Sequence, residues 1–231
     1  MPLRAPTFGG KVVLWIAVVL VLVLAGGDAT AQSRHLTVHE SSRFWIQGQA
    51  SIKSFTCVVD RVEGEARMLA DRKRLSSSAD EQQVTVTLTV PVRAFDCGRE
   101  GMTEDLQETL RMEEHPEIQF ELVHARAGPA TDSSASWREI EVLGPLTIAG
   151  TKRLLRYNVV GRTYGPNHAR TRGCKTIKMT YFGIEPPTKA FGLIKVDNRI
   201  DVKFDLLATA PQDTTEQFST PPATNPPSCN E

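Results

Sequence analysis

Apolar and polar residues alternate strictly in two segments of the chain, 84–92 and 118–122. In the first segment aliphatic residues occupy the even positions and threonines lie between them: Val84, Val86, Leu88, Val90 and Val92 against Thr85, Thr87 and Thr89. Ile118, Phe120 and Leu122 repeat the alternation. A period of two puts successive side chains on opposite faces of a strand. Each segment is therefore predicted to be a strand with one buried face, and together they indicate a sheet that closes over an apolar interior.

The rest of the region 34–210 is also predicted to be mostly strand. The predicted strands are 42–49, 55–69 with a break, 84–92, 117–125, 138–148, 154–162, 175–182 and 199–208. Gly-Pro and Pro-Pro pairs mark turns or bends between and within them, at 128–129, 144–145, 165–166 and 186–187. About eight antiparallel strands in one domain predict an all-β fold, either a two-sheet sandwich or a closed barrel.

One short helix is predicted, over Thr103–Met112. Thr103 is the expected N-cap, and Glu104 and Asp105 would place negative charge at the positive end of the helix dipole. The apolar stripe of this helix consists of Met102, Leu106 and Leu110. The helix could plug one end of a barrel or gate a ligand, and periodicity does not separate the two roles.

The N-terminal segment has the features of a cleaved signal peptide. Arg4 and Lys11 precede an uninterrupted apolar run, Val12–Ala25, and Ala29-Thr30-Ala31 supplies the small residues that a signal peptidase recognises. This run covers about 21 Å at about 1.5 Å per residue, which is short of the roughly 30 Å hydrocarbon core of a bilayer. Residues 1–31 are therefore expected to be removed on export, which places the protein in the periplasm or outside the cell.

Composition excludes one class of partner and separates the C-terminal tail from the domain. Removing residues 1–31 takes two basic residues and one acidic residue from 27 of each, which leaves 25 and 26. A nucleic-acid-binding protein needs a clustered positive surface, and none is indicated. From Pro211 onward there are five Pro and four Thr in 21 residues. Residues 211–231 are expected to be disordered because they cannot bury enough apolar surface, so the barrel or sandwich domain is 34–210.

Ten short sequence words occur in the order in which a known protein family has them. They are Arg43-Phe44-Trp45-Ile46, Ser54-Phe55-Thr56-Cys57, Val90-Pro91-Val92, Asp96-Cys97-Gly98, Met102, Asp105-Leu106, Glu114-His115-Pro116-Glu117-Ile118-Gln119-Phe120, Gly144-Pro145-Leu146-Thr147-Ile148-Ala149-Gly150, Phe182-Gly183-Ile184-Glu185-Pro186-Pro187 and Gly192-Leu193-Ile194-Lys195-Val196. No word is specific alone, but their order over essentially the whole domain is. The chain resembles the YceI-like family.

The resemblance implies a lipocalin-like antiparallel barrel with the helix near one end, exported in bacteria, whose interior holds a long isoprenoid or fatty chain. A barrel of about eight strands either is filled by side chains or encloses one small ligand, and the sequence does not decide between them. The candidates for an apolar ligand-binding wall are Phe55, Val86, Leu88, Ile118, Phe120, Phe182, Phe191, Leu193 and Phe204. Each of them could instead be an ordinary core residue.

Three polar residues are candidates for contact with a ligand head group. Tyr181 stands where the family commonly has an aspartate, and Lys53 stands where many members carry a histidine. Both lie near the expected barrel mouth. His115 precedes Pro116 at the end of the predicted helix, where its alternative role is a cap or a hydrogen bond to a loop carbonyl.

The resemblance also implies a disulfide, because a subset of the family carries the pair Cys57 and Cys97. A disulfide between them closes a loop of about forty residues, which would stabilise the fold by about 4 kcal/mol in the chain-entropy model. Cys174 lies where the family pattern asks for no cysteine, and Cys229 lies in the tail. These two could pair with each other, stay free, or link two chains.

Other chemistry finds little support in the sequence. His35 and His39 are four residues apart, a spacing that brings two metal ligands together on a helix but not on an extended segment. The G-x-S-x-G nucleophile motif of a serine hydrolase is absent from the sequence. We therefore predict a protein that is not an enzyme and has no metal or cofactor. The leading function is a carrier or scavenger of a long-chain isoprenoid or fatty-acid-type lipid. The alternative is an interaction module that presents its loops and tail to a membrane or redox partner protein. Dimerisation and the identity of the lipid stay open.

Overall fold

The structure, a computed structural model, describes residues 34–59, 61–69, 83–128, 137–164, 167–210 and Cys229. The predicted signal peptide and the tail, except for Cys229, lie outside the described residues. The chain divides into two compact units, Met1–Gln32 and Ser33–Glu231. The following description concerns the second.

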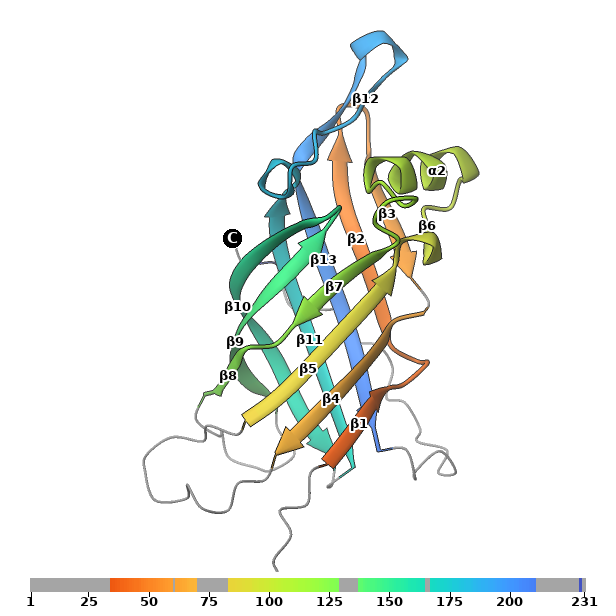
Figure 1. Cartoon of the computed structure of the whole chain (residues 1–231). Helices are drawn as coiled ribbons and strands as arrows, with labels where there is room; N and C mark the ends of the chain where they lie inside the picture. Colours follow the sequence, from red (N-terminus) through yellow and green to blue (C-terminus); the bar gives the residue numbers. More distant parts are fainter. Residues whose placement is uncertain are drawn as a thin grey trace, which may run out of the picture. The chain divides into compact units, whose positions relative to one another are not determined.

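The described strands form a closed antiparallel barrel (Figure 1). They are β1 (Arg34–Val38), β2 (Arg43–Ala50), β3 (Ser54–Val59), β4 (Glu63–Leu69), β5 (Gln83–Pro91), β6 (Phe95–Asp96), β7 (Glu117–Glu121), β8 (His124–Ala127), β9 (Arg138–Ile148), β10 (Thr151–Tyr164), β11 (His168–Lys178), β12 (Thr188–Lys189) and β13 (Ile194–Thr209). Neighbours around the barrel run β1-β4-β5-β7-β9-β10-β11-β13. Pairing of Thr37 with Thr209 and of Val38 with Ala208 then joins β13 back to β1. The all-β prediction is confirmed as an eight-stranded barrel.

Several strands are interrupted, so two short strands share one position in the wall. β2 pairs with the first half of β13 while β1 pairs with its end. The predicted break within 55–69 is confirmed between β3 and β4. The predicted strand 117–125 is divided into β7 and β8 at Leu122 and Val123, whose N–H groups still donate to the carbonyls of Val86 in β5 and Leu143 in β9. β1 was not among the predicted strands.

The predicted strand 175–182 is wrong at its end. β11 stops at Lys178, and the chain continues as the 3-10 turn η3 (Met179–Phe182). Gly183 closes this turn with a φ of 71°, a left-handed conformation that glycine adopts at little cost. The turn folds the Phe182 ring into the core, where the side chain is 1% exposed.

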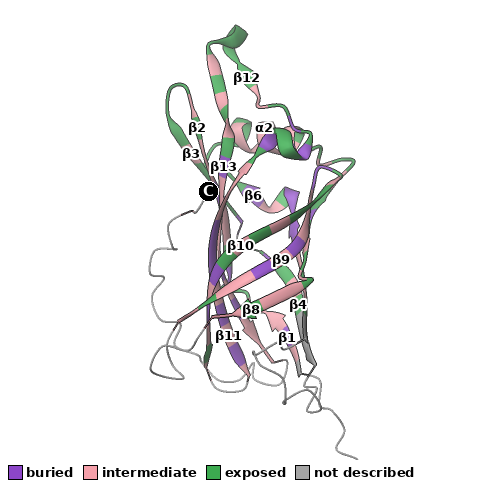
Figure 2. Ribbon diagram, turned by 90° about the vertical axis from the view of Figure 1, so that its left-hand side faces the viewer, coloured by how far each residue is buried: buried purple, intermediate pink, exposed green. Residues whose placement is uncertain are grey.

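The helix α2 (Glu100–Thr109) lies at one end of the barrel (Figure 1). It starts earlier than predicted, with Arg99 at the N-cap and no side-chain cap, so the prediction that Thr103 caps it is wrong. The Thr103 hydroxyl instead accepts a hydrogen bond from the backbone N–H of Cys97 at 3.0 Å. The predicted apolar stripe does face inward: Met102 and Leu106 pack against the core and Leu110 is buried. In Figure 2 the exposed residues gather on the outer side of α2 and around β12.

Two disulfides join segments that are distant in sequence. Cys57 of β3 is bonded to Cys97 just after β6, with their Cα atoms 4.0 Å apart, which confirms the predicted pair. Cys174 of β11 is bonded to Cys229, with a Cα–Cα distance of 4.6 Å. Of the three alternatives left open for these two cysteines, the structure has the pair within one chain.

A buried ion cluster lies on the outward side of β11. Arg170 donates from Nε and Nη2 to the two carboxylate oxygens of Asp205, at 2.7 and 2.8 Å. Arg172 donates from Nε to Asp205 Oδ2 at 3.1 Å. All three residues are buried. The bidentate hydrogen bond to Asp205 raises the pKa of Arg170, so its charge is fixed.

Candidate ligand-binding site

The interior of the barrel contains an apolar cavity. Its volume of about 70 Å³ is room for several water molecules. Its walls come from seven strands and from Val62, and the lining residues are Phe44, Val62, Leu88, Val90, Ile118, Phe120, Leu146, Leu155, Tyr157, Lys175, Ile177, Val202, Phe204 and Leu206.

Strand periodicity explains why this interior is apolar. On β13 the even-numbered residues Val202, Phe204 and Leu206 border the cavity, while Asp201 and Lys203 lie on the other face. The same alternation brings Ile118 and Phe120 of β7 inward. The large rings fit because glycines lie opposite them. A Cβ at Gly173 would overlap the ring of Phe204, which is its cross-strand partner.

Four of the nine predicted wall residues line this cavity: Leu88, Ile118, Phe120 and Phe204. Phe55, Val86 and Phe182 do not border it. Phe182 lies in the packed core, Phe55 packs against that core, and Val86 is half-buried. Phe191 and Leu193 are wrong as wall residues because Phe191 is fully exposed and Leu193 is 78% exposed. Both belong to the loop between β12 and β13, beyond the barrel end (Figure 1).

None of the three predicted head-group residues borders the cavity. Lys53 is exposed in the turn between β2 and β3. The ring of His115 packs against the turn between β9 and β10, where a Cβ at Gly150 would meet it. The ring of Tyr181 is half-exposed, and the Arg153 guanidinium stacks over it, 5.0 Å from the ring centre. Arg153 Nε also donates a hydrogen bond to the Tyr181 carbonyl at 2.8 Å. This contact orders the η3 turn from outside the barrel.

The cavity instead takes its polar groups from Tyr157 of β10 and Lys175 of β11, which the sequence reasoning missed. The Tyr157 ring packs edge-on against Phe120, with 6.1 Å between ring centres. Burial raises the pKa of the Tyr157 hydroxyl well above its ordinary value, so the hydroxyl keeps its proton. The alternation Leu155, Tyr157, Val159 within the predicted strand 154–162 was a signal that could have placed this residue inside.

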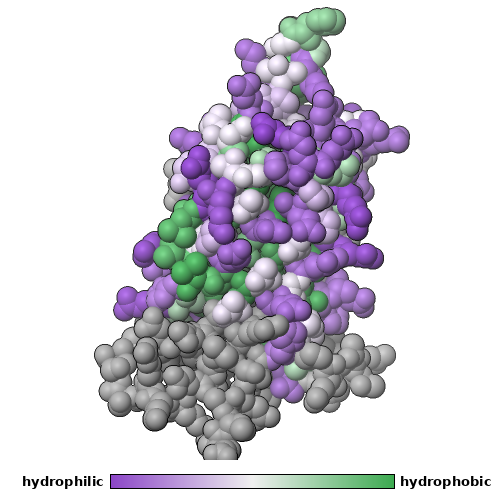
Figure 3. Space-filling view, in the orientation of Figure 1, coloured by the Kyte–Doolittle hydropathy of each residue, from purple (hydrophilic) through white to green (hydrophobic). Residues whose placement is uncertain are grey.

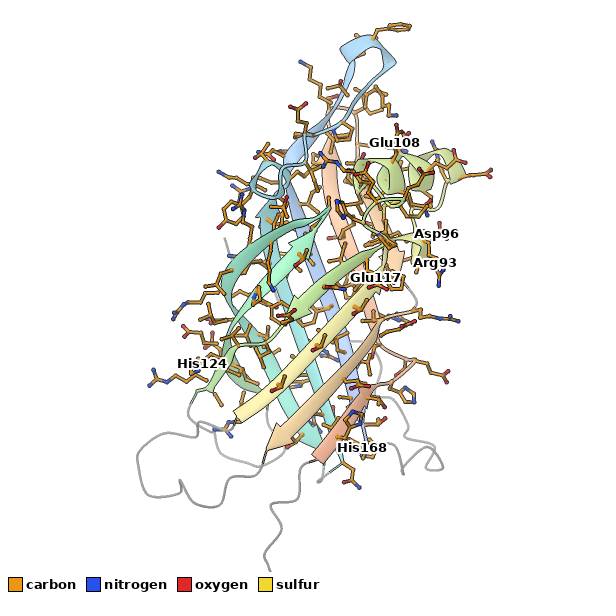
Figure 4. All side chains as sticks on the ribbon, in the orientation of Figure 1. Arg93, Asp96, Glu108, Glu117, His124 and His168 are labelled. Atoms are coloured by element: carbon orange, nitrogen blue, oxygen red, sulfur yellow. A yellow bond between two sulfur atoms is a disulfide. The ribbon has the colours of Figure 1, made fainter. Side chains whose placement is uncertain are left out.

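A second, polar pocket is lined in part by the ionisable residues Asp197, Arg199 and Asp201. Figure 4 shows Glu108 on α2 and His168 at the opposite barrel end. The described ranges contain no group of three or more His, Cys, Asp or Glu residues that could hold a metal ion. No helix within these ranges has the length and hydropathy needed to cross a membrane.

Comparisons with known proteins agree with this geometry. The model of the YceI-like domain matches residues 32–208. The crystal structure of BcnA from Burkholderia cenocepacia superposes with a TM-score of 0.54 at 17% identity, covering 74% of this chain and 99% of that one. A polyisoprenoid-binding domain from Saccharophagus degradans, implicated in plant cell wall breakdown, superposes with a TM-score of 0.56 at 11% identity, covering 78% of this chain and all of that one. At these identities the likeness shows the fold. No curated protein matched the chain.

Proposed function

Because the chain belongs to the YceI-like family, we propose that it binds the tail of a long-chain amphiphile, of isoprenoid or fatty-acid type, inside the barrel and carries it outside the cytoplasm. The observation that carries this proposal is the cavity inside the barrel, whose lining is apolar except at Tyr157 and Lys175. The Saccharophagus degradans domain, which shares the fold, is described as polyisoprenoid-binding. Binding, not catalysis, is the proposed activity.

The energetics favour a long chain over a short one. Each buried methylene contributes roughly 0.8 kcal/mol, so ten carbons contribute about 8 kcal/mol before losses. Immobilising a ligand costs about 4–15 kcal/mol, and a short chain would therefore bind weakly. The cavity of about 70 Å³ is narrow. A long tail would require the walls to move apart, so we expect the loaded barrel to be wider than the empty one.

The disulfides support a location outside the cytoplasm. Both cysteine pairs are bonded, and such bonds persist in oxidising compartments such as the periplasm. Together with the predicted signal peptide, this supports a periplasmic or secreted protein.

Lipid extraction tests the carrier proposal. The protein would be produced by secretion in a bacterial host, purified, and analysed by native mass spectrometry and solvent extraction. We expect a co-purified amphiphile in the wild type. Phe120→Asp should lose it, because that side chain borders the cavity and an unpaired carboxylate is strongly disfavoured in an apolar interior. Val123→Asp is the matched control, because Val123 is 65% exposed two positions after β7. A wild-type protein with neither extractable lipid nor affinity for added lipid would overturn the proposal.

The interaction-module alternative rests on the loop that holds Phe191 and Leu193. Ile52, in the neighbouring turn between β2 and β3, is also exposed. Ser51 ties the two loops together, since its hydroxyl donates to the Leu193 carbonyl at 3.2 Å. Three exposed apolar side chains on joined loops suit a contact surface. A barrel without lipid would favour this function.

A further inference from the structure

The charged residue on the cavity wall, Lys175, has a well-defined place in the barrel. It lies on β11 directly opposite Val202 of β13, and both border the cavity. On β11 the next inward-facing residue, Ile177, also borders the cavity. Lys175 is the one residue of the described lining whose side chain carries a formal charge at neutral pH.

That charge has no counterion on the cavity wall. Asp, Glu and the other charged types are absent from the lining, and the described ranges contain no ion pair or hydrogen bond of the Lys175 ammonium group. By contrast, the arginines on the opposite face of β11 are both bonded to Asp205. A charge beside apolar surface is costly unless something of opposite sign meets it. The cavity wall therefore contains no acidic residue that could pair with the Lys175 ammonium group.

The ladder between β10 and β11 ends close to Lys175. β10 and β11 pair from Tyr164 and His168 up to Val159 and Gly173, where the ladder stops. Beyond that point β10 stays paired with β9 and curves away from β11 (Figures 1 and 2). Tyr157 and Lys175 each lie two residues beyond this last pair, and both side chains face into the barrel. Both polar groups of the cavity thus lie on the two strands just past the end of their shared ladder.

We infer that the amphiphile bound by this barrel carries an oxyanion, a carboxylate or a phosphate, which the Lys175 ammonium pairs with and the Tyr157 hydroxyl donates to. The inference rests on the proposed function and specifies the class of ligand. The tail lies along the aliphatic and aromatic wall, and the oxyanion lies beside Lys175 and Tyr157. Tyr157 suits this role because it holds its proton and has no hydrogen-bond partner among the described residues. A neutral lipid of the same length would leave Lys175 without a counterion.

Matched pairs of lipids test this assignment. The protein from Gln32 onward, which contains the whole compact unit Ser33–Glu231, would be delipidated and titrated with palmitate and 1-hexadecanol, and separately with farnesyl phosphate and farnesol. We expect the anionic member of at least one pair to bind about tenfold or more tightly than its alcohol, since a hydrogen-bonded charge pair has about that effect. The pair that shows the larger ratio identifies the oxyanion as carboxylate or phosphate.

Variants then locate the effect. Lys175→Met should remove the preference by weakening the binding of the anionic member of each pair, and Tyr157→Phe should reduce the preference by a smaller factor. Lys178→Met is the matched control, because Lys178 lies on the same strand but is exposed on the outer face. Lys175→Gln replaces the Met variant should the latter not fold, as judged by thermal melting. If both members of each pair bind equally and Lys175→Met changes neither, the oxyanion assignment is overturned while the carrier function stands. If no lipid binds, the carrier function itself fails.

Discussion

Two short turns of this protein carry the same local sequence feature and have opposite burial. The 3-10 turns η3 (Met179–Phe182) and η4 (Ala190–Gly192) each place a phenylalanine before a glycine with positive φ, 71° at Gly183 and 90° at Gly192. The Phe182 side chain is 1% exposed and that of Phe191 is fully exposed. Apolar residues form the outermost tip in Figure 3, where the loop of η4 ends.

The difference comes from what surrounds each turn. η3 follows directly from β11, and its neighbour Ile184 is part of the same core as Met179 and Phe182. η4 is reached through β12, which has two residues and pairs only with the start of β13 in the described structure. Lys189 of β12 bonds to Asp105 of α2, but no described element covers the Phe191 ring, which is fully exposed. Burial of a phenylalanine is thus set by the elements around the turn and not by the turn itself.

The sharpest test of this comparison is truncation of both rings. Phe182→Ala should lower the free energy of unfolding by about 3–5 kcal/mol, because it opens a cavity in a packed core. Phe191→Ala should change it by less than about 0.5 kcal/mol, as for other exposed positions. Urea denaturation followed by tryptophan fluorescence measures both. Equal losses would show that the η4 loop is packed against something.

Alanine at the two glycines gives a smaller contrast. A left-handed φ costs an L-residue about 1–2 kcal/mol, and the packed surroundings of η3 prevent the backbone from relaxing. We therefore expect Gly183→Ala to lower the free energy of unfolding by about that amount. A Cβ at Gly192 would meet no atom within 4 Å, but the φ of 90° strains any L-residue, so Gly192→Ala should cost no more than Gly183→Ala, up to about 1–2 kcal/mol. Urea midpoints of the two variants would be compared, and a larger loss at Gly192 would contradict the comparison.

The smallest expected effect is a gain. Phe191 itself has a φ of 54°, a conformation that is unfavourable for a bulky residue. Phe191→Gly should relieve this and raise the unfolding free energy by up to about 1 kcal/mol, less the entropy that glycine adds to the unfolded chain. Differential scanning calorimetry with Phe191→Ala as reference separates the backbone effect from loss of the ring. A lower melting temperature for Phe191→Gly than for Phe191→Ala would mean that the backbone at residue 191 is not strained.

The sequence predicted those parts of the fold in which one face is buried along a whole strand. β9 occupies the predicted range 138–148, and Ile118 and Phe120 face inward as their alternation indicated. β1 was missed because only Leu36 and Val38 of its five residues are apolar, which gives too weak a periodic signal. The end of β11 was misplaced because Lys175–Phe182 alternates as a strand would, and the left-handed Gly183 that folds Phe182 inward has no periodic signature.

The site was predicted less well than the fold, for a physical reason. Phe191 and Leu193 were assigned to the wall by residue type, but their loop extends past the elements that could cover it. Lys175 was overlooked because a charged residue is normally outward, although its parity with Ile177 placed it inside. On β11, residue type and strand parity disagree at Lys175, and parity gave the correct face.

The contact that closes the barrel also has a kinetic consequence. Thr37 and Thr209, whose pairing joins the first strand to the last, are 172 residues apart in sequence. β1 also pairs with β4, and β13 with β11 and β2, but the contact between β1 and β13 requires closure of this long loop, and all-β topologies with such contacts fold in milliseconds to seconds. A chain that emerges from a translocation channel N-terminus first cannot complete this ladder until β13 has followed. If the chain is exported N-terminus first, as proposed, the wall can close only after β13 has crossed, so folding of the barrel would follow export.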